Sequence, residues 1–112
     1  MNPCWTVTSE NIQAAIQEIV RIGRPRKVIL FGSALRGETN VHSDLDILVV
    51  TGDKVQSPRK ESVRIRRALR GISMPMDILV ISEEQLREVA DEPGLIYREA
   101  LRHGKVVYES PG

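Results

Sequence analysis

Three aspartates and a Gly-Ser pair are the residues of this 112-residue chain whose types and spacing suit chemistry. Asp44 and Asp46 are separated by one residue where an apolar run begins. Side chains two apart on a strand share a face, so these carboxylates repel each other unless a cation lies between them. Hard divalent cations such as Mg²⁺ prefer oxygen ligands and bridge carboxylates to phosphates. The pair by itself is equally typical of two solvated acids at the end of a strand.

Asp77 strengthens the interpretation as a metal site, because it lies in the otherwise apolar stretch 76–81. A carboxylate is costly to bury unless it is paired or binds a metal. If 76–81 forms a strand beside the one that carries Asp46, three carboxylates converge. That arrangement suits phosphoryl chemistry assisted by two metal ions. The alternative is an aspartate at a sheet edge that faces water.

Gly32 and Ser33 directly follow an apolar run and favour an anion site there. Glycine permits a sharp turn and the close approach of a phosphate. If Ser33 begins a helical turn that reaches Arg36, its free N–H groups and its hydroxyl are available to an anion. Ordinary turns share this pattern, so the pair is weak evidence when taken alone.

The hydrophobic pattern predicts an α/β (α+β) fold, a small mixed β-sheet flanked by helices, to position these residues. Short apolar runs typical of strands occupy residues 27–31, 45–50, 76–81 and 105–108. Amphipathic or capped stretches predict helices at 9–22 and 57–70, from 82 onward, and at 95–102. The length fits a single domain over residues 1–112.

Composition excludes several classes of protein and leaves others open. The formal net charge of +1 predicts no particular partner, and the single cysteine, Cys4, rules out an internal disulfide or a cysteine metal cluster. No apolar run approaches the roughly 18 residues of a membrane span, and the N-terminus lacks the pattern of a signal peptide. We therefore expect a soluble, cytoplasmic protein without membrane contact.

One stretch, residues 54–70, is strongly basic and contains a single acidic residue, Glu61. Its seven basic residues are Lys54, Arg59, Lys60, Arg64, Arg66, Arg67 and Arg70. This pattern indicates either a solvated helix face or a surface for a polyanion or an acidic partner.

Taken together, Gly32-Ser33, the Asp44-x-Asp46 pair after ten intervening residues and Asp77 in a hydrophobic strand resemble the DNA polymerase beta-like nucleotidyltransferase superfamily. The short length and the Ala-Leu-Arg-Gly sequence after Ser33 resemble its minimal nucleotidyltransferase (MNT) group. The resemblance covers residues 27–81. Val41-His42 stand where the family often has Pro-Asp, a departure that lies outside the metal ligands. His42 is interpreted as an incidental loop residue, with a role as general base as the alternative.

The resemblance implies a role for each residue of the motif. The Gly32-Ser33 pair would bind the nucleotide, with Ser33 holding the β- and γ-phosphates of a nucleoside triphosphate, and Arg36 would contact phosphate. Asp44 and Asp46 would ligate Mg²⁺, with two ions expected. Asp77 would be the third metal ligand and would help to deprotonate the incoming hydroxyl.

The resemblance also implies an antitoxin that transfers AMP from ATP to a tyrosine of a partner toxin of the helical HEPN type. Few residues follow 76–81, so the acceptor must be bound by a partner or a dimer, or be the partner itself. One alternative is a non-catalytic antitoxin that masks its partner by binding. Another is a nucleotidyltransferase acting on a small molecule or an RNA end. Nucleic acid is the less favoured partner because aromatic residues that stack on bases are nearly absent.

Overall fold

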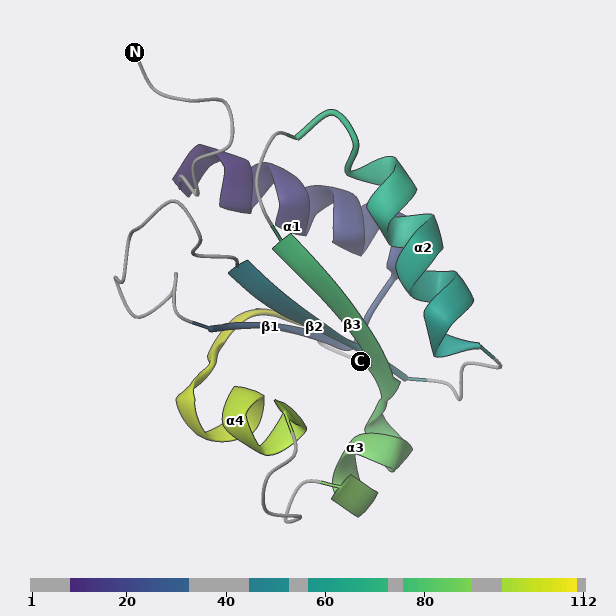
Figure 1. The fold of residues 1–112 in the computed structure, drawn as a ribbon, viewed down its shortest axis with the longest axis vertical. Helices are drawn as coiled ribbons and strands as arrows, with labels where there is room; N and C mark the ends of the chain where they lie inside the picture. The colour runs from purple at the N-terminus through teal and green to yellow at the C-terminus, as the bar shows by residue number, and fades with distance from the viewer. Residues whose placement is uncertain (1–8, 33–44, 53–56, 73–75, 90–95, 111–112) are drawn as a thin grey trace.

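The computed structural model shows a four-stranded sheet with helices against both of its faces (Figure 1). The structure describes residues 9–32, 45–52, 57–72, 76–89 and 96–110. In chain order the elements are α1 (Ser9–Gly23), β1 (Lys27–Phe31), β2 (Leu45–Thr51), α2 (Pro58–Ala68), β3 (Met76–Ser82), α3 (Glu83–Val89), α4 (Ile96–His103) and β4 (Lys105–Glu109). The predicted fold class, a small mixed sheet flanked by helices, is confirmed. Over these described ranges, no helix has the length and apolar character required to cross a membrane.

The strands lie in the order β3-β2-β1-β4 across the sheet. β1 is antiparallel to both β2 and β4, whereas β2 and β3 are parallel. A parallel pair needs a crossover connection, and α2 supplies it by carrying the chain back to the end of the sheet where β2 began. The expected helices and strands are present, with ends shifted by a residue or two; the helix predicted to reach residue 70 ends at Ala68.

Apolar side chains fill both faces of the sheet, as the continuous apolar run of β1 predicts. α1 and α2 cover one face and α3 and α4 cover the other (Figure 1). The core under α1 and α2 includes Ala15, Ile19, Val28, Leu30, Leu45, Ile47, Val49, Ile65, Leu69, Ile78 and Val80. The core under α3 and α4 includes Ile29, Phe31, Leu48, Val50, Ile81, Leu86 and Ala100.

Serine caps begin two of the helices that frame the sheet. The Lys60 N–H donates to Ser57 Oγ over 3.3 Å, and Pro58 occupies the first turn of α2. The Gln85 N–H donates to Ser82 Oγ over 3.2 Å at the start of α3. Both caps are confirmed as the sequence predicts, and they satisfy N–H groups that a helix leaves without partners in its first turn.

Candidate active site

Two of the expected acids lie side by side at one end of the sheet. In the register of the parallel pair, Asp46 of β2 is opposite Asp77 of β3. In the antiparallel pair, Asp46 is opposite Phe31, the residue that precedes Gly32. β2 and β3 therefore begin, and β1 ends, at the same end of the sheet. Strand pairing brings together three segments that are far apart in the sequence.

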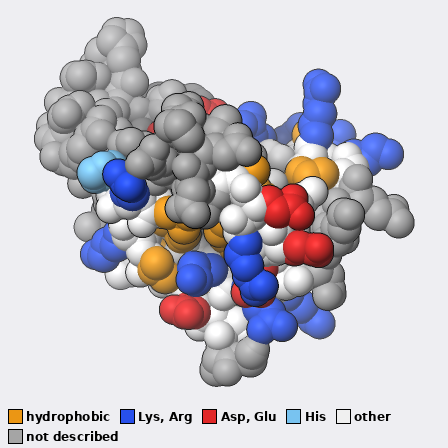
Figure 2. Space-filling view, turned by 90° about the horizontal axis from the view of Figure 1, so that it is seen from below, with side chains coloured by type: hydrophobic (Ala, Val, Ile, Leu, Met, Phe, Trp, Pro, Cys, Tyr) orange, Lys and Arg blue, Asp and Glu red, His pale blue; other side chains and the backbone are white. Residues whose placement is uncertain are grey.

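Successive side chains of β2 and of β3 point to opposite faces of the sheet, and this alternation sets the face on which the two acids lie. Leu45 and Ile47 belong to the core under α1 and α2, and so does Ile78. Asp46 and Asp77, one position out of step with these residues, consequently fall on the face that carries α3 and α4. Figure 2 views the molecule from this side and shows basic and acidic side chains interspersed around a strip of apolar ones.

Asp77 is more accessible than the sequence suggests. The expectation that it carries a burial cost within an apolar strand is wrong, because β3 is an edge strand and the Asp77 side chain is 56% exposed. Asp46, on the inner strand β2, is only partly buried. The case for a site consequently rests on the register of the two acids and not on the cost of burying one of them.

Arg66 contacts Asp77 and was not singled out by the sequence. Its Nη2 lies 3.4 Å from Asp77 Oδ1, and both side chains are about half exposed. Arg66 comes from α2, which packs on the opposite face, so the contact passes around the outer edge of β3. One helical turn earlier, Ser62 Oγ donates to the carbonyl of Ile78 over 2.8 Å. The i, i+4 spacing of residues 62 and 66 is the signal that aligns Arg66 with the start of β3.

Gly32 has the backbone conformation for which glycine was expected. Its φ is 101°, in a region that residues with a Cβ rarely adopt. The chain therefore turns sharply at the end of β1, next to the position of Asp46. The other predicted site residues, Ser33, Arg36 and Asp44, lie outside the described residues, as does His42.

A divalent cation fits the chemistry of the two described acids. Opposed carboxylates supply the oxygen ligands that Mg²⁺ prefers, and a cation would offset their repulsion. Among the described residues, no three or more His, Cys, Asp or Glu side chains lie together in a way that could hold a metal. Asp46 and Asp77 are two of the three expected ligands, and Asp44 is the third.

Comparison with solved structures shows that the fold is shared. A candidate nucleotidyltransferase from Sulfolobus solfataricus matches with a TM-score of 0.59 and 20% identity, over 89% of this chain and 78% of that chain. A toxin-antitoxin structure with AMP-PNP matches with a TM-score of 0.56 and 20% identity, over 88% of this chain and 74% of that chain. At such identities the likeness concerns the fold. No curated protein matches the chain.

The family model described as polymerase beta, nucleotidyltransferase matches residues 10–111. The chain therefore belongs to the polymerase beta nucleotidyltransferase family.

Proposed function

We propose that the protein is a Mg²⁺-dependent nucleotidyltransferase that acts as an antitoxin, transferring AMP from ATP to a tyrosine of a HEPN-type toxin. The observation that carries the proposal is the register of Asp46 opposite Asp77, beside the turn at Gly32. Two carboxylates at the end of a sheet, next to a glycine turn suited to phosphate, match the demands of phosphoryl transfer. Membership of the nucleotidyltransferase family supports the same reaction class.

Each residue of the proposed site has a distinct task. Gly32 and Ser33 hold the phosphates of ATP, with Arg36 as a further phosphate contact. Asp44, Asp46 and Asp77 hold two Mg²⁺ ions, which supply charge neutralisation on the phosphates when bound. The whole chain, residues 1–112, serves as a single nucleotidyltransferase domain in this proposal.

The transfer exchanges one bond to phosphorus for another. The tyrosine oxygen bonds to the α-phosphorus of ATP, the bond from that phosphorus to the bridging oxygen of the β-phosphate breaks, and pyrophosphate leaves. Asp77 helps to remove the proton of the tyrosine hydroxyl. Its exposure favours this task, because an acceptor on another protein can reach only a carboxylate that is open to the surface.

The proposed partner is supported by the comparison with the toxin-antitoxin structure. That structure contains AMP-PNP, an analogue of ATP, and shares the fold of this chain. A protein acceptor also suits the small size of the domain. In the cytoplasm, where we place the protein, ATP and Mg²⁺ are both available.

Two other functions fit part of the observations. A non-catalytic antitoxin would bind and mask its partner, and it would not require the alignment of Asp46 with Asp77. A nucleotidyltransferase acting on a small molecule or an RNA end would use the same site with a different acceptor. The opposed acids favour catalysis over masking, because two carboxylates at one end of the sheet supply oxygen ligands for a cation that masking does not require.

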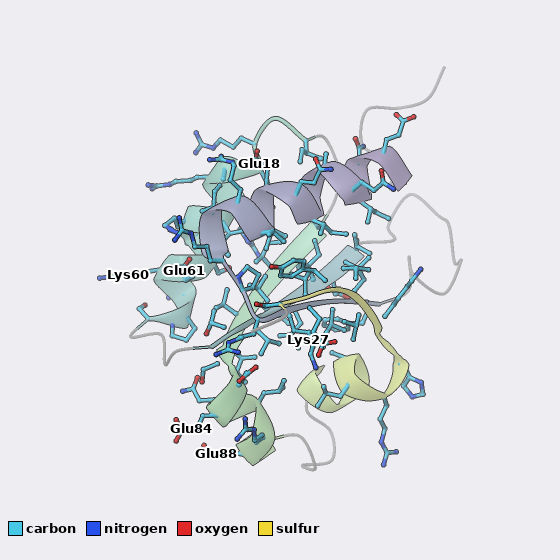
Figure 3. The ribbon with its side chains drawn as sticks, turned by 180° about the vertical axis from the view of Figure 1, so that it is seen from behind. Glu18, Lys27, Lys60, Glu61, Glu84 and Glu88 are labelled. Atoms are coloured by element: carbon cyan, nitrogen blue, oxygen red, sulfur yellow. The ribbon has the colours of Figure 1, made fainter. Side chains whose placement is uncertain are left out.

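Transfer of label from [α-³²P]ATP tests the proposal directly. The protein is incubated with Mg²⁺ and the product of the adjacent reading frame, and we expect label on a tyrosine of that product. Asp46→Asn should abolish labelling. Glu88→Gln is the matched control, because it removes one negative charge on the outer side of α3, away from the site (Figure 3). If a folded pair of proteins forms a complex without labelling, masking is the function and catalysis is not.

A further inference from the structure

β3 presents an open edge on the side of the sheet away from β2. It is the terminal strand of the order β3-β2-β1-β4, so no described strand pairs with its outer edge. The hydrogen bond from Ser62 Oγ to the carbonyl of Ile78 shows that this carbonyl faces outward. Because backbone groups alternate along a strand, the N–H and C=O of Val80 face the same way. An edge of this kind can accept an extended segment of another chain.

A groove of about 420 Å³ lies between this edge and α2. Its walls include Arg59, Ser62, Val63 and Arg66 from α2, and Leu79 and Val80 from β3. Val63 is 42% exposed, so part of its apolar side chain is open to a binding partner. The groove therefore offers an apolar wall beside an open strand edge.

The charge of the groove is positive. Two arginines, Arg59 and Arg66, are among its lining residues, and none of those residues is acidic. Other charges of α2 are turned elsewhere: Arg64 lies 3.6 Å from Glu61 and donates to the carbonyl of Ile22 in α1 over 2.6 Å. Within α2, Arg64 is thus held against α1, whereas Arg59 and Arg66 line the groove.

One end of the groove reaches the candidate active site. Arg66 lines the groove and contacts Asp77 at 3.4 Å, so a chain lying beside β3 passes directly by this carboxylate. The lining contains no aromatic residue on which a nucleic-acid base could stack. A polypeptide is therefore the better fit than single-stranded RNA.

We propose that this groove binds an extended acidic segment of the acceptor protein, which adds beside β3 and brings its acceptor side chain to Asp77. The inference rests on the proposed function for the identity of the acceptor. Carboxylates of the segment pair with Arg59, alternate apolar side chains contact Val63 and Leu79, and the backbone bonds to the outer edge of β3.

Fluorescence anisotropy with a labelled peptide tests the docking surface without any transfer reaction. The probe is a fluorescein-labelled peptide of about eight residues that alternates Asp and Val, and its counterpart has Lys in place of Asp. We expect the acidic peptide to bind at least about tenfold more tightly than the basic one. Equal affinities for the two peptides would overturn the charge argument.

Matched variants locate the binding on the groove. Arg59→Glu and Val63→Asp should each weaken binding of the acidic peptide at least about fivefold. Lys60→Glu changes the net charge as Arg59→Glu does, but Lys60 does not line the groove and points away from the protein (Figure 3). Leu101→Asp places an aspartate at another exposed apolar position, on α4, and controls for Val63→Asp. Both controls should stay within about twofold of the original protein; if Lys60→Glu weakens binding as strongly as Arg59→Glu, the groove is not the site.

Two further measurements separate this inference from its alternatives. A fluorescein-labelled oligouridine that binds more tightly than the acidic peptide, and that Arg59→Glu weakens, would show a nucleic-acid surface and overturn the proposal. The Asp46→Asn variant should lose binding of Mg²⁺ and fluorescent ATP but should still bind the acidic peptide. If Asp46→Asn loses nucleotide binding but Arg59→Glu binds the peptide normally, the docking inference fails and the proposed function stands. If Arg59→Glu weakens peptide binding but Asp46→Asn binds nucleotide normally, the proposed function fails and the groove remains a peptide site.

Discussion

At the scale of single residues, Asp46 and Asp77 lie opposite each other on neighbouring strands, with Asp77 well exposed. Neither carboxylate is fully buried. Their loss should therefore affect chemistry far more than folding, because neither side chain belongs to an apolar core.

Asp46→Asn should reduce nucleotidyl transfer at least about a hundredfold, since it removes a carboxylate that would hold Mg²⁺ beside the reacting phosphate. Asp44→Asn should behave in the same way. The free energy of unfolding without metal should change by less than about 0.5 kcal/mol or rise slightly, because the repulsion between neighbouring acids is relieved. Urea denaturation and labelled ATP measure the two effects. Full transfer activity in either variant would show that the metal assignment is wrong.

The ion pair between Arg66 and Asp77 should contribute little to stability. Both side chains are more than half exposed, at 52% and 56%, and water screens exposed pairs. A double-mutant cycle with Arg66→Ala and Asp77→Asn should give a coupling energy below about 1 kcal/mol, and added salt should reduce it. Arg67→Ala controls for the loss of a helix arginine. A coupling of several kcal/mol would show that the pair is more enclosed than this exposure indicates.

Sequence and structure contribute differently to these residues. The acids are recognisable from the sequence because each interrupts an apolar run. Their alignment depends on the register of β2 and β3, which α2 connects. The sequence of either strand alone does not predict this long-range pairing. Arg66 was hidden for a similar reason: within a helix rich in basic residues, only the packing of α2 against β3 distinguishes it from Arg67.

At the scale of elements, Gly104 joins α4 to β4 and is closely surrounded by atoms of β1 and α4. A Cβ on Gly104 would lie 2.6 Å from Ile29 Cγ2 and 2.9 Å from the carbonyl oxygen of Leu30, and it would also collide with the carbonyl oxygen of Ala100. Gly104 thus lets the chain turn from α4 directly into its pairing with β1.

Gly104→Ala should lower the free energy of unfolding by about 1–3 kcal/mol or more, because backbone atoms must shift to admit the methyl group. Gly71→Ala is the matched control, since a Cβ there meets no atom within 4 Å. The control should be neutral or gain up to about 1 kcal/mol by restricting the unfolded chain. Thermal and urea denaturation measure both variants. Equal effects at the two glycines would contradict the close packing at the α4–β4 junction.

The local elements are largely predictable, because their signals are local. Hydrophobic periodicity identifies the helices and strands, and Ser57 and Ser82 mark helix starts that the hydrogen bonds confirm. The order β3-β2-β1-β4 is not predictable in this way. β4 pairs with β1 across most of the chain, and no local signal in residues 105–109 indicates which edge they join.

At the scale of the whole molecule, one sheet separates two apolar cores and belongs to both. Ile47 and Leu48 are neighbours on β2, each fully buried, and they face opposite cores. Because β2 is an inner strand that contributes side chains to both cores, unfolding of one core destabilises the other. The molecule should therefore unfold as one unit.

Ile47→Ala and Leu48→Ala should each cost about 2–5 kcal/mol, because each leaves a cavity in a packed core. Both variants should keep a single unfolding transition, with circular dichroism and calorimetry giving the same midpoint. Val106→Ala, on a side chain that is 48% exposed at the sheet edge, should cost much less. Two separate transitions in either core variant would show that the layers fold independently.

The pairing of β4 with β1 also has a consequence during protein synthesis. Residues 32–104 separate the two strands, and a ribosome adds about 5–20 residues per second, so the outer edge of β1 waits several seconds for its partner. During that interval β1 presents unpaired backbone groups beside the apolar side chains of Val28 and Ile29. A translation pause or a premature stop in this region would prolong the exposure, and nascent chains are then most vulnerable to aggregation and to capture by chaperones.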